Sequence, residues 1–161
     1  VKKLDYECEL AVVLGRDARD VPAGQTRDYI FGYTILNDVS ARDVQTAHKQ
    51  WYFGKSLDGF TPIGPCIVTA DAFADYPPRL GIRSFVNGEK RQDSNTALQI
   101  FDIDHVIAEL SQGMTLKAGT IIATGTPAGV GMGMDPPQFL KPGDVVRCEI
   151  DGIGTLTNPV E

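Results

Sequence analysis

The segment Tyr6–Gly15, YECELAVVLG, limits the folds open to this chain more than any other stretch. The apolar run from Leu10 to Leu14 does not alternate with polar residues, which is typical of a strand covered on both faces. Glu7 and Glu9 come directly before and at the start of this run, and residues two apart on a strand point to the same face. Two carboxylates about 4 Å apart repel each other by roughly 4 kcal/mol at an effective dielectric constant near 20. A cation, a basic side chain or a shared proton must offset this repulsion, unless both glutamates face water at a strand end.

Composition excludes several classes of function. The chain has 161 residues, which fits one domain spanning 1–161. Its net charge is −6 and no basic stripe is present, so we expect no nucleic-acid partner. Its apolar runs are too short to span a membrane, and its N-terminus lacks a signal-peptide pattern. Three widely spaced cysteines predict free thiols and a cytoplasmic location.

The chain begins at Val1, without a methionine and only a few residues before an apparent core strand. We therefore expect that a short N-terminal segment is missing and that the chain is a fragment of a longer protein.

Short strand-like runs, separated by Gly and Pro, predict an α+β domain that is predominantly β. Strands do not alternate regularly with helices, which argues against a doubly wound parallel sheet. Asn87-Gly88 and Asp151-Gly152 predict hairpin turns. The predicted strands are 9–14, 31–37, 66–70, 80–86, 96–101, 120–124 and 145–150.

The segment 102–113, DIDHVIAELSQG, is the clearest helix. Asp102 or Asp104 can cap its N-terminus, and Gly113 ends it. A shorter helical segment is expected within 40–51. The expected apolar stripe of the long helix consists of Val106, Ile107 and Leu110.

A second cluster of polar residues follows the predicted strand 31–37. Asp38 lies at the strand end, which is a usual place for a functional side chain on a rigid scaffold. Arg42 could hold a carboxylate through two parallel hydrogen bonds, with Gln45 nearby. The alternative is a helix N-cap at Asp38 or Ser40, with Arg42 and its neighbour as a solvated pair.

Two further segments have the composition of functional loops. Lys55 lies in WYFGKSLDGF among aromatic residues, so its ammonium group either extends to solvent or is held near an anion. The segment ATGTPAGVGMG, which contains Thr126, is rich in glycine and lets backbone approach a ligand closely. It is neither a phosphate-binding P-loop nor a dinucleotide fingerprint.

The clusters together predict a metal site. Glu7, Glu9 and Asp38 offer only oxygen ligands, which suit Mg²⁺ or Mn²⁺. Such a site leaves about three positions for water or a chelating substrate. The residues then available to hold the anionic ends of a substrate are Arg42, Gln45, Lys55 and Thr126.

At these residues the sequence resembles the fumarylacetoacetate hydrolase superfamily, specifically its C-terminal catalytic domain. The resemblance covers nearly the whole chain. It is carried by YECELAVVLGRDA, DYIFGYTILNDVSARDVQ, GKSLDGFTPIGPCIVTADA, VNGEKRQDSNT and TGTPAGVGMG, in that order. It implies a mixed-sheet β-roll with few short helices, a homodimer and bound Mg²⁺, with Mn²⁺ or Ca²⁺ as substitutes.

The resemblance also implies roles for individual residues. The family's metal site matches Glu7, Glu9 and Asp38, and its lysine matches Lys55 as the catalytic residue. Its substrate-contacting residues match Arg42, Gln45 and Thr126.

The expected reaction is Mg²⁺-dependent hydrolysis of a C–C bond in a small anionic 2,4-dioxo acid, such as an acylpyruvate, through a metal-stabilised enolate. The alternatives are an isomerase or decarboxylase of a hydroxymuconate-type acid in aromatic catabolism, and a 2-oxo acid decarboxylase or tautomerase. The rival from another class is a non-catalytic metal-binding domain.

One departure from the hydrolytic members affects the choice of reaction. Those members supply a His–Glu pair from a segment before the Glu-x-Glu strand to activate water. His48 and His105 do not lie at that position, and we expect both to be ordinary residues, with His48 as a candidate substitute.

Overall fold

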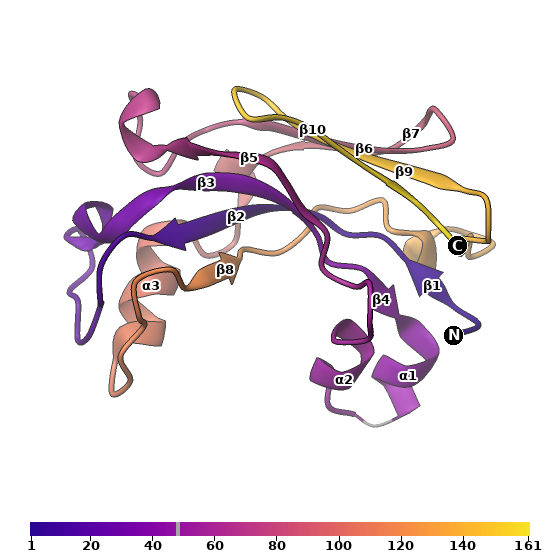
Figure 1. Ribbon diagram of the computed structural model, residues 1–161, viewed down its shortest axis with the longest axis horizontal. Coiled ribbons are helices and arrows are strands. Elements are labelled where there is room, and N and C mark those ends of the chain that lie inside the picture. Colours follow the sequence, from indigo (N-terminus) through magenta and orange to yellow (C-terminus); the bar gives the residue numbers. More distant parts are fainter. Residues whose placement is uncertain (48) are drawn as a thin grey trace.

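The computed structural model describes residues 1–47 and 49–161 (Figure 1). Two four-stranded sheets dominate it, and their paired strands run antiparallel. The first sheet has the order β5 (Ile63–Thr69), β3 (Ile30–Asn37), β2 (Cys8–Leu14) and β8 (Ile121–Ala123). The second has the order β10 (Gly154–Pro159), β9 (Val145–Ile150), β6 (Gly81–Val86) and β7 (Glu89–Asn95).

The remaining elements are short. A two-stranded ribbon pairs β1 (Leu4–Asp5) with β4 (Ser40–Ala41), and α1 (Arg42–Ala47) and α2 (Tyr52–Lys55) follow it. In the view of Figure 1 the longer α3 (Ile103–Ser111) lies below the first sheet, and the second sheet lies above. Single 3₁₀ turns occur at Thr26–Tyr29, Ala70–Ala72, Thr96–Leu98 and Gly131–Gly133. The predominantly β fold with few short helices is thus confirmed.

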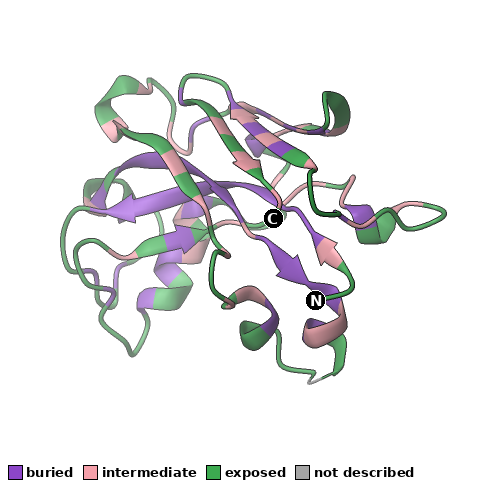
Figure 2. Ribbon diagram, turned by 45° about the vertical axis from the view of Figure 1, so that its right-hand side comes forward, coloured by how far each residue is buried: buried purple, intermediate pink, exposed green. Residues whose placement is uncertain are grey.

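Strand β2 is the centre of the core. Every one of its residues is buried, as Figure 2 shows, which confirms the prediction of a strand covered on both faces. Its side chains share one hydrophobic cluster with Ile82 and Ile150 of the second sheet and with Ile107 of α3. β2 is therefore a rigid support for any side chain at its ends.

Both predicted hairpins are present, but only Asn87-Gly88 forms the two-residue type I′ turn that the sequence predicts at both. Asn87 and Gly88 both have positive φ, 52° and 85°, and join β6 to β7 where Val86 pairs with Glu89. The second hairpin, from β9 to β10, uses a three-residue loop, because Ile150 pairs with Gly154. The first hairpin fixes the register of β7, a strand too polar to be recognised from its sequence.

The predicted strand 96–101 is wrong. β7 ends at Asn95, whose side chain accepts a hydrogen bond from the backbone N–H of Ala97 and caps a 3₁₀ turn. The Thr96 hydroxyl donates to the carbonyl oxygen of Pro78 at 2.6 Å, so the chain is turned away from the sheet. Ile100 is 93% exposed, so the apolar side chains of this segment do not pack into the core as those of a buried strand would.

The helix α3 follows the prediction with one correction, at Leu110. Asp102 is the N-cap and accepts from the backbone N–H of His105 at 2.8 Å, whereas Asp104 bonds to the 24–26 loop. Leu110 is exposed, and the buried side includes Ile107 but extends to Ala108 instead. The ring of His105 stacks on Phe101, and His48 lies outside the described residues.

Replacing Asp102 with alanine should lower the free energy of unfolding by about 1 kcal/mol, because an orphan N–H of α3 loses its acceptor. Urea denaturation measures this difference. Asp102→Asn keeps an acceptor and should recover most of the loss, and equal losses in both variants would mean that capping is not the cause.

No helix in the part of the chain described by the structure is long and apolar enough to cross a membrane.

Candidate metal and substrate site

Three carboxylates meet where β2 and β3 approach the β1–β4 ribbon. Glu7 precedes β2, Glu9 belongs to it, and Asp38 follows β3, whose register places Asn37 opposite Cys8. Each carboxylate has a ligand oxygen within 4.8 Å of those of the other two. Glu7 and Glu9 are buried and Asp38 is half-buried. The alternative in which the glutamates face water is therefore wrong.

Two basic side chains reach this cluster from the short helices. Lys55 places its Nζ 2.8 Å from Glu7 Oε2 and 2.6 Å from Asp38 Oδ2. Arg42 places Nη2 2.7 Å from Glu7 Oε1. The side chain of Lys55 is only 18% exposed, so its ammonium group is held by anions and does not extend to solvent. These ion pairs offset much of the repulsion within the cluster.

Arg42 also contacts Gln45, which lies one turn later on α1. Nη1 of Arg42 donates to Oε1 of Gln45 at 3.2 Å, and both side chains are buried. Since Arg42 is buried, the alternative of a solvated ion pair there is wrong. The acceptor oxygen of Gln45 is engaged by Arg42, which leaves its amide N–H groups as donors.

Burial changes the acid–base properties of the cluster. It raises the pKa of Glu9 to about 8, and the nearby Asp38 and Glu7 add to this, although the N–H of Gly125 opposes it. Burial likewise raises the pKa of Asp38, against the effect of its hydrogen bond from Lys55. Burial lowers the pKa of Lys55, but hydrogen bonds to Asp38 and Glu7 outweigh it and raise that pKa. Burial therefore favours the protonated form of Glu9, which lowers the repulsion within the cluster.

The glycine-rich segment after β8 forms one wall of the site. Gly125 donates its N–H to Glu9 Oε2 at 2.7 Å. The hydroxyl of Thr126 donates to the carbonyl oxygen of Cys8 at 2.9 Å and accepts from Nε2 of Gln92 at 2.8 Å. Thr126 thus lies beside the carboxylates, with its proton engaged by β2.

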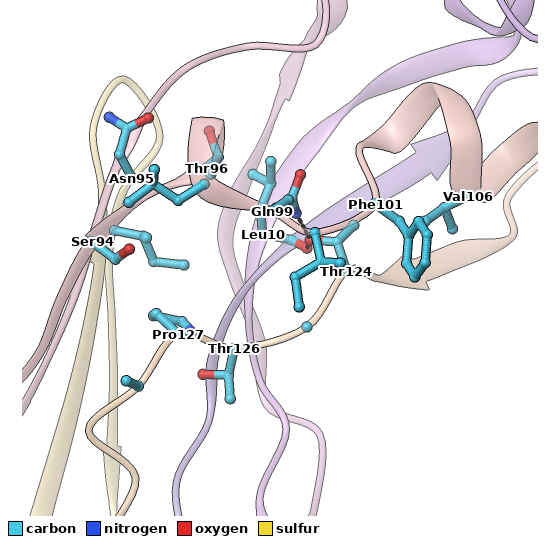
Figure 3. A pocket seen from close by; sticks show the side chains of 15 residues that line it. Leu10, Ser94, Asn95, Thr96, Gln99, Phe101, Val106, Thr124, Thr126 and Pro127 are labelled. Carbon is cyan, nitrogen blue, oxygen red and sulfur yellow. Dashed lines mark hydrogen bonds between the residues drawn. The ribbon is translucent and has the colours of Figure 1, made fainter.

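A cavity of about 460 Å³ adjoins this wall (Figure 3). Gly125 and Thr126 line it, together with Leu10, whose neighbour Glu9 belongs to the carboxylate cluster. Gln99 and Thr124 point toward one another there and share a hydrogen bond of 2.8 Å. The volume is in the range of small-molecule pockets.

Sequence reasoning missed two buried residues next to the site. Asp5 is fully buried and contacts Arg42, and Gln92 is 1% exposed and bonds to Thr126. A signal for Asp5 was present, because Asp5, Glu7 and Glu9 continue the same two-residue spacing. The role of Gln92 depends on a hairpin register that its own segment does not reveal.

The donor set fits a divalent metal ion. Three carboxylates provide hard oxygen ligands, which suit Mg²⁺, Mn²⁺ or Ca²⁺. Their ligand atoms are close enough together to hold a single ion.

Known proteins share this sequence and fold. The family model for the fumarylacetoacetate (FAA) hydrolase C-terminal domain matches residues 1–161. Oxaloacetate tautomerase YisK of Bacillus subtilis (strain 168) is 50% identical over 158 residues, which are 98% of this chain and 52% of that protein. The chain spans about half the length of the curated relatives it matches.

Solved structures give the same result. A fumarylacetoacetate hydrolase from Exiguobacterium antarcticum superimposes with a TM-score of 0.96 and 51% identity, over 100% of this chain and 57% of that one. A 2-hydroxyhepta-2,4-diene-1,7-dioate isomerase from Mycobacterium marinum superimposes with a TM-score of 0.88 and 46% identity, over 98% of this chain and 58% of that one. With a family model that covers residues 1–161, these matches mean that the chain belongs to the fumarylacetoacetate hydrolase family.

Proposed function

We propose that this chain carries the active site of a divalent-metal-dependent enzyme that interconverts keto and enol forms of a small 2-oxo diacid such as oxaloacetate. The observation that carries the proposal is the cluster of Glu7, Glu9 and Asp38 with the ammonium group of Lys55 against it. Tautomerisation needs a stabilised enolate and a group that moves one proton. The name of the B. subtilis relative, an oxaloacetate tautomerase, supports this reaction.

Glu7, Glu9 and Asp38 are the residues that would hold the metal ion, which we propose to be Mg²⁺, with Mn²⁺ or Ca²⁺ as substitutes. When bound, the ion supplies a Lewis acid that stabilises negative charge on the substrate oxygens.

Lys55 is the proposed catalytic residue. Its ammonium group adds positive charge beside a developing enolate and can donate a proton to the adjacent carbon, and the neutral amine that remains can take a proton back. Its hydrogen bonds to Glu7 and Asp38 aim it into the site. Lys55 combines both roles because it is charged, partly buried and held at a fixed position.

Arg42 and Gln45 are proposed to orient a substrate carboxylate. Three of the five N–H groups of Arg42 are directed at Asp5, Gln45 and Glu7, which leaves two for a ligand. Gln45 adds its amide N–H groups. Thr126 can accept a hydrogen bond from a substrate, and it can donate one only by releasing the Cys8 carbonyl.

Hydrolysis of a C–C bond in a 2,4-dioxo acid is the second candidate. It passes through the same kind of enolate, and the E. antarcticum structure is named a fumarylacetoacetate hydrolase. The isomerase from M. marinum marks a third reaction of this type, on a dienedioate. The proposed substrate class is therefore a small anionic 2-oxo acid in each case.

We further propose a single catalytic domain over 1–161, a homodimer and a cytoplasmic location. Three free thiols support the last of these. The exposed Leu98, Ile100 and Phe101 support a subunit interface, because large exposed apolar patches mark interaction surfaces.

The test follows the ultraviolet band of enol-oxaloacetate as it relaxes to the keto form. Acceleration should require Mg²⁺ and disappear with EDTA. Asp38→Asn should weaken Mg²⁺ binding at least about tenfold in calorimetry, since it removes a proposed ligand. Asp71→Asn, a change at an exposed aspartate, is the matched control and should behave as wild type.

Each other outcome points to a different conclusion. Release of pyruvate from acylpyruvates, together with a carboxylate that carries one oxygen from labelled water, would replace tautomerisation by hydrolysis. Mg²⁺ binding without any turnover would favour a non-catalytic domain. Mg²⁺ affinity of Asp38→Asn equal to wild type would refute the ligand assignment.

A further inference from the structure

Asp5 is a buried carboxylate with no assigned role. It lies in β1 and is 0% exposed. Its Oδ1 accepts from the N–H groups of Tyr6 at 3.0 Å and Gly131 at 2.8 Å. Its Oδ2 accepts from Nε of Arg42 and from the N–H of Met132, each at 2.9 Å. Both oxygens therefore have two donors, and the buried charge is paired with a buried guanidinium.

This pairing determines where the guanidinium of Arg42 points. The group is planar and rigid, so a hydrogen bond that fixes Nε also fixes the directions of Nη1 and Nη2. Those two nitrogens contact Gln45 Oε1 at 3.2 Å and Glu7 Oε1 at 2.7 Å. Asp5 thus contacts Arg42 through Nε, whereas Glu7 of the carboxylate cluster contacts it through Nη2.

The glycine-rich turn at Gly131–Gly133 completes this arrangement. A Cβ on Gly131 would lie 2.0 Å from the carbonyl oxygen of Gln138 and 2.8 Å from Asp5 Oδ1. Glycine therefore allows the turn to approach Asp5 closely enough to donate two backbone N–H groups. The hydrogen bonds from the turn fix the position of Asp5, and the hydrogen bond from Arg42 to Asp5 fixes the orientation of the guanidinium.

We propose that Asp5 is a positioning residue, which aims Arg42 at Glu7 and at the carboxylate of the substrate. This inference rests on the proposed function, in which Arg42 orients that carboxylate. Asp5 has no contact with Glu7, Glu9 or Asp38 among its recorded hydrogen bonds, so it acts through Arg42. A purely structural role would instead make Asp5 important only for folding.

The test variant is Asp5→Asn, which keeps the size of the side chain but turns an N–H₂ group toward two of the four donors. We expect kcat/KM for oxaloacetate to fall about 10- to 100-fold, mainly through a higher KM, as is typical when a supporting residue is removed. Arg42→Lys keeps the positive charge but removes the planar guanidinium group and its fixed N–H directions. In the Arg42→Lys background, Asp5→Asn should have less than about threefold further effect, because residues that act as a unit are not additive.

A spectroscopic readout makes the test independent of turnover. In the wild-type protein the Nε–H signal of Arg42 in a ¹H–¹⁵N spectrum should exchange slowly with water, because that N–H is buried and bonded. The signal is assigned by its loss in Arg42→Lys. In Asp5→Asn it should shift and exchange at least about tenfold faster, since only a weaker hydrogen bond remains.

Asp104→Asn is the matched control. It also removes a carboxylate that accepts from a backbone N–H and a hydroxyl, but its partners are Gly24 and Thr26. It should lower stability and leave both KM and the Arg42 signal unchanged.

The results that overturn the proposal are specific. A wild-type KM in Asp5→Asn, or an equal loss of kcat/KM with and without Arg42→Lys, would mean that Asp5 does not act through Arg42. If Asp5→Asn does not fold, rapid exchange of the wild-type Arg42 signal would by itself overturn it. If the wild-type protein does not turn over oxaloacetate, the proposed function fails, while the Arg42 signal still decides whether Asp5 positions Arg42.

Discussion

Lys55→Met should reduce metal-dependent turnover by about 10²- to 10⁴-fold, the range for loss of a proton-transferring group, and should not weaken Mg²⁺ binding. Lower turnover without weaker Mg²⁺ binding is an unusual combination, because most substitutions next to a metal site reduce both turnover and metal affinity. It follows from the position of Lys55, whose Nζ contacts Glu7 and Asp38.

The physical reason is competition for the same carboxylates. In the absence of metal the ammonium group of Lys55 neutralises Glu7 and Asp38, and a cation must displace part of that interaction. Methionine has a similar length without charge, so the variant leaves the carboxylates less compensated. Mg²⁺ binding by the variant should therefore be as tight as in the wild type or tighter, whereas the positive charge beside the enolate is lost.

Stopped-flow ultraviolet kinetics and calorimetry measure the two effects separately. Lys117→Met is the control, since Lys117 pairs only with Asp17 among its recorded ion pairs and has a side chain that is 73% exposed. A parallel loss of turnover and Mg²⁺ affinity in Lys55→Met would show that Lys55 organises the metal site and does not act on the substrate. Wild-type turnover would remove Lys55 from the mechanism.

The three clustered carboxylates could be found from the sequence for a simple physical reason. The spacing of Glu7 and Glu9 puts them on one face, and the burial of the apolar run after them is a local property. Asp38 lies at a strand end that Asn37-Asp38 itself indicates. What brings Asp38 to the glutamates is the pairing of β2 with β3, which neighbouring strands in sequence commonly adopt.

Other features of the site depend on contacts that no local pattern reveals. Asp5 has its partners at Arg42 and at the 131–133 turn, more than 120 residues away in the second case. Gln92 lies in a strand of polar residues, where only the register with β6 turns its side chain inward. The strand prediction at 96–101 is wrong for the same reason. The hydrogen bonds to Asn95 and Pro78 that end the strand cannot be read from the segment itself.

Removing metal should make stability fall as pH rises from about 5 to about 8, which is opposite to ordinary acid denaturation. Burial raises the pKa of Glu9 to about 8 from 4.5. Between these values the folded protein holds a proton that the unfolded chain releases, so unfolding becomes easier as pH increases. At 1.36 kcal/mol per pKa unit, the loss for Glu9 has an upper limit of about 5 kcal/mol.

Asp38 and Lys55 do not cancel this effect. The pKa of Asp38 is also raised, mainly by burial, so its contribution has the same sign. The pKa of Lys55 is raised from 10.5, so its stabilising contribution stays complete below that value. Added Mg²⁺ binds the deprotonated carboxylates and should therefore raise Tm more at pH 8 than at pH 6.

Thermal unfolding in EDTA across this pH range, with and without Glu9→Gln, separates Glu9 from every other group. Glutamine removes the titration, so in EDTA the variant should lose most of the pH dependence between 5 and 8. When Mg²⁺ replaces EDTA, the variant should also lose most of the stabilisation by the ion. Glu109→Gln changes an exposed glutamate of α3 and should follow the wild-type curve. If Glu9→Gln keeps the wild-type slope, the proton is not on Glu9. Repulsion within the carboxylate cluster would then have to be offset by Lys55 and Arg42 alone.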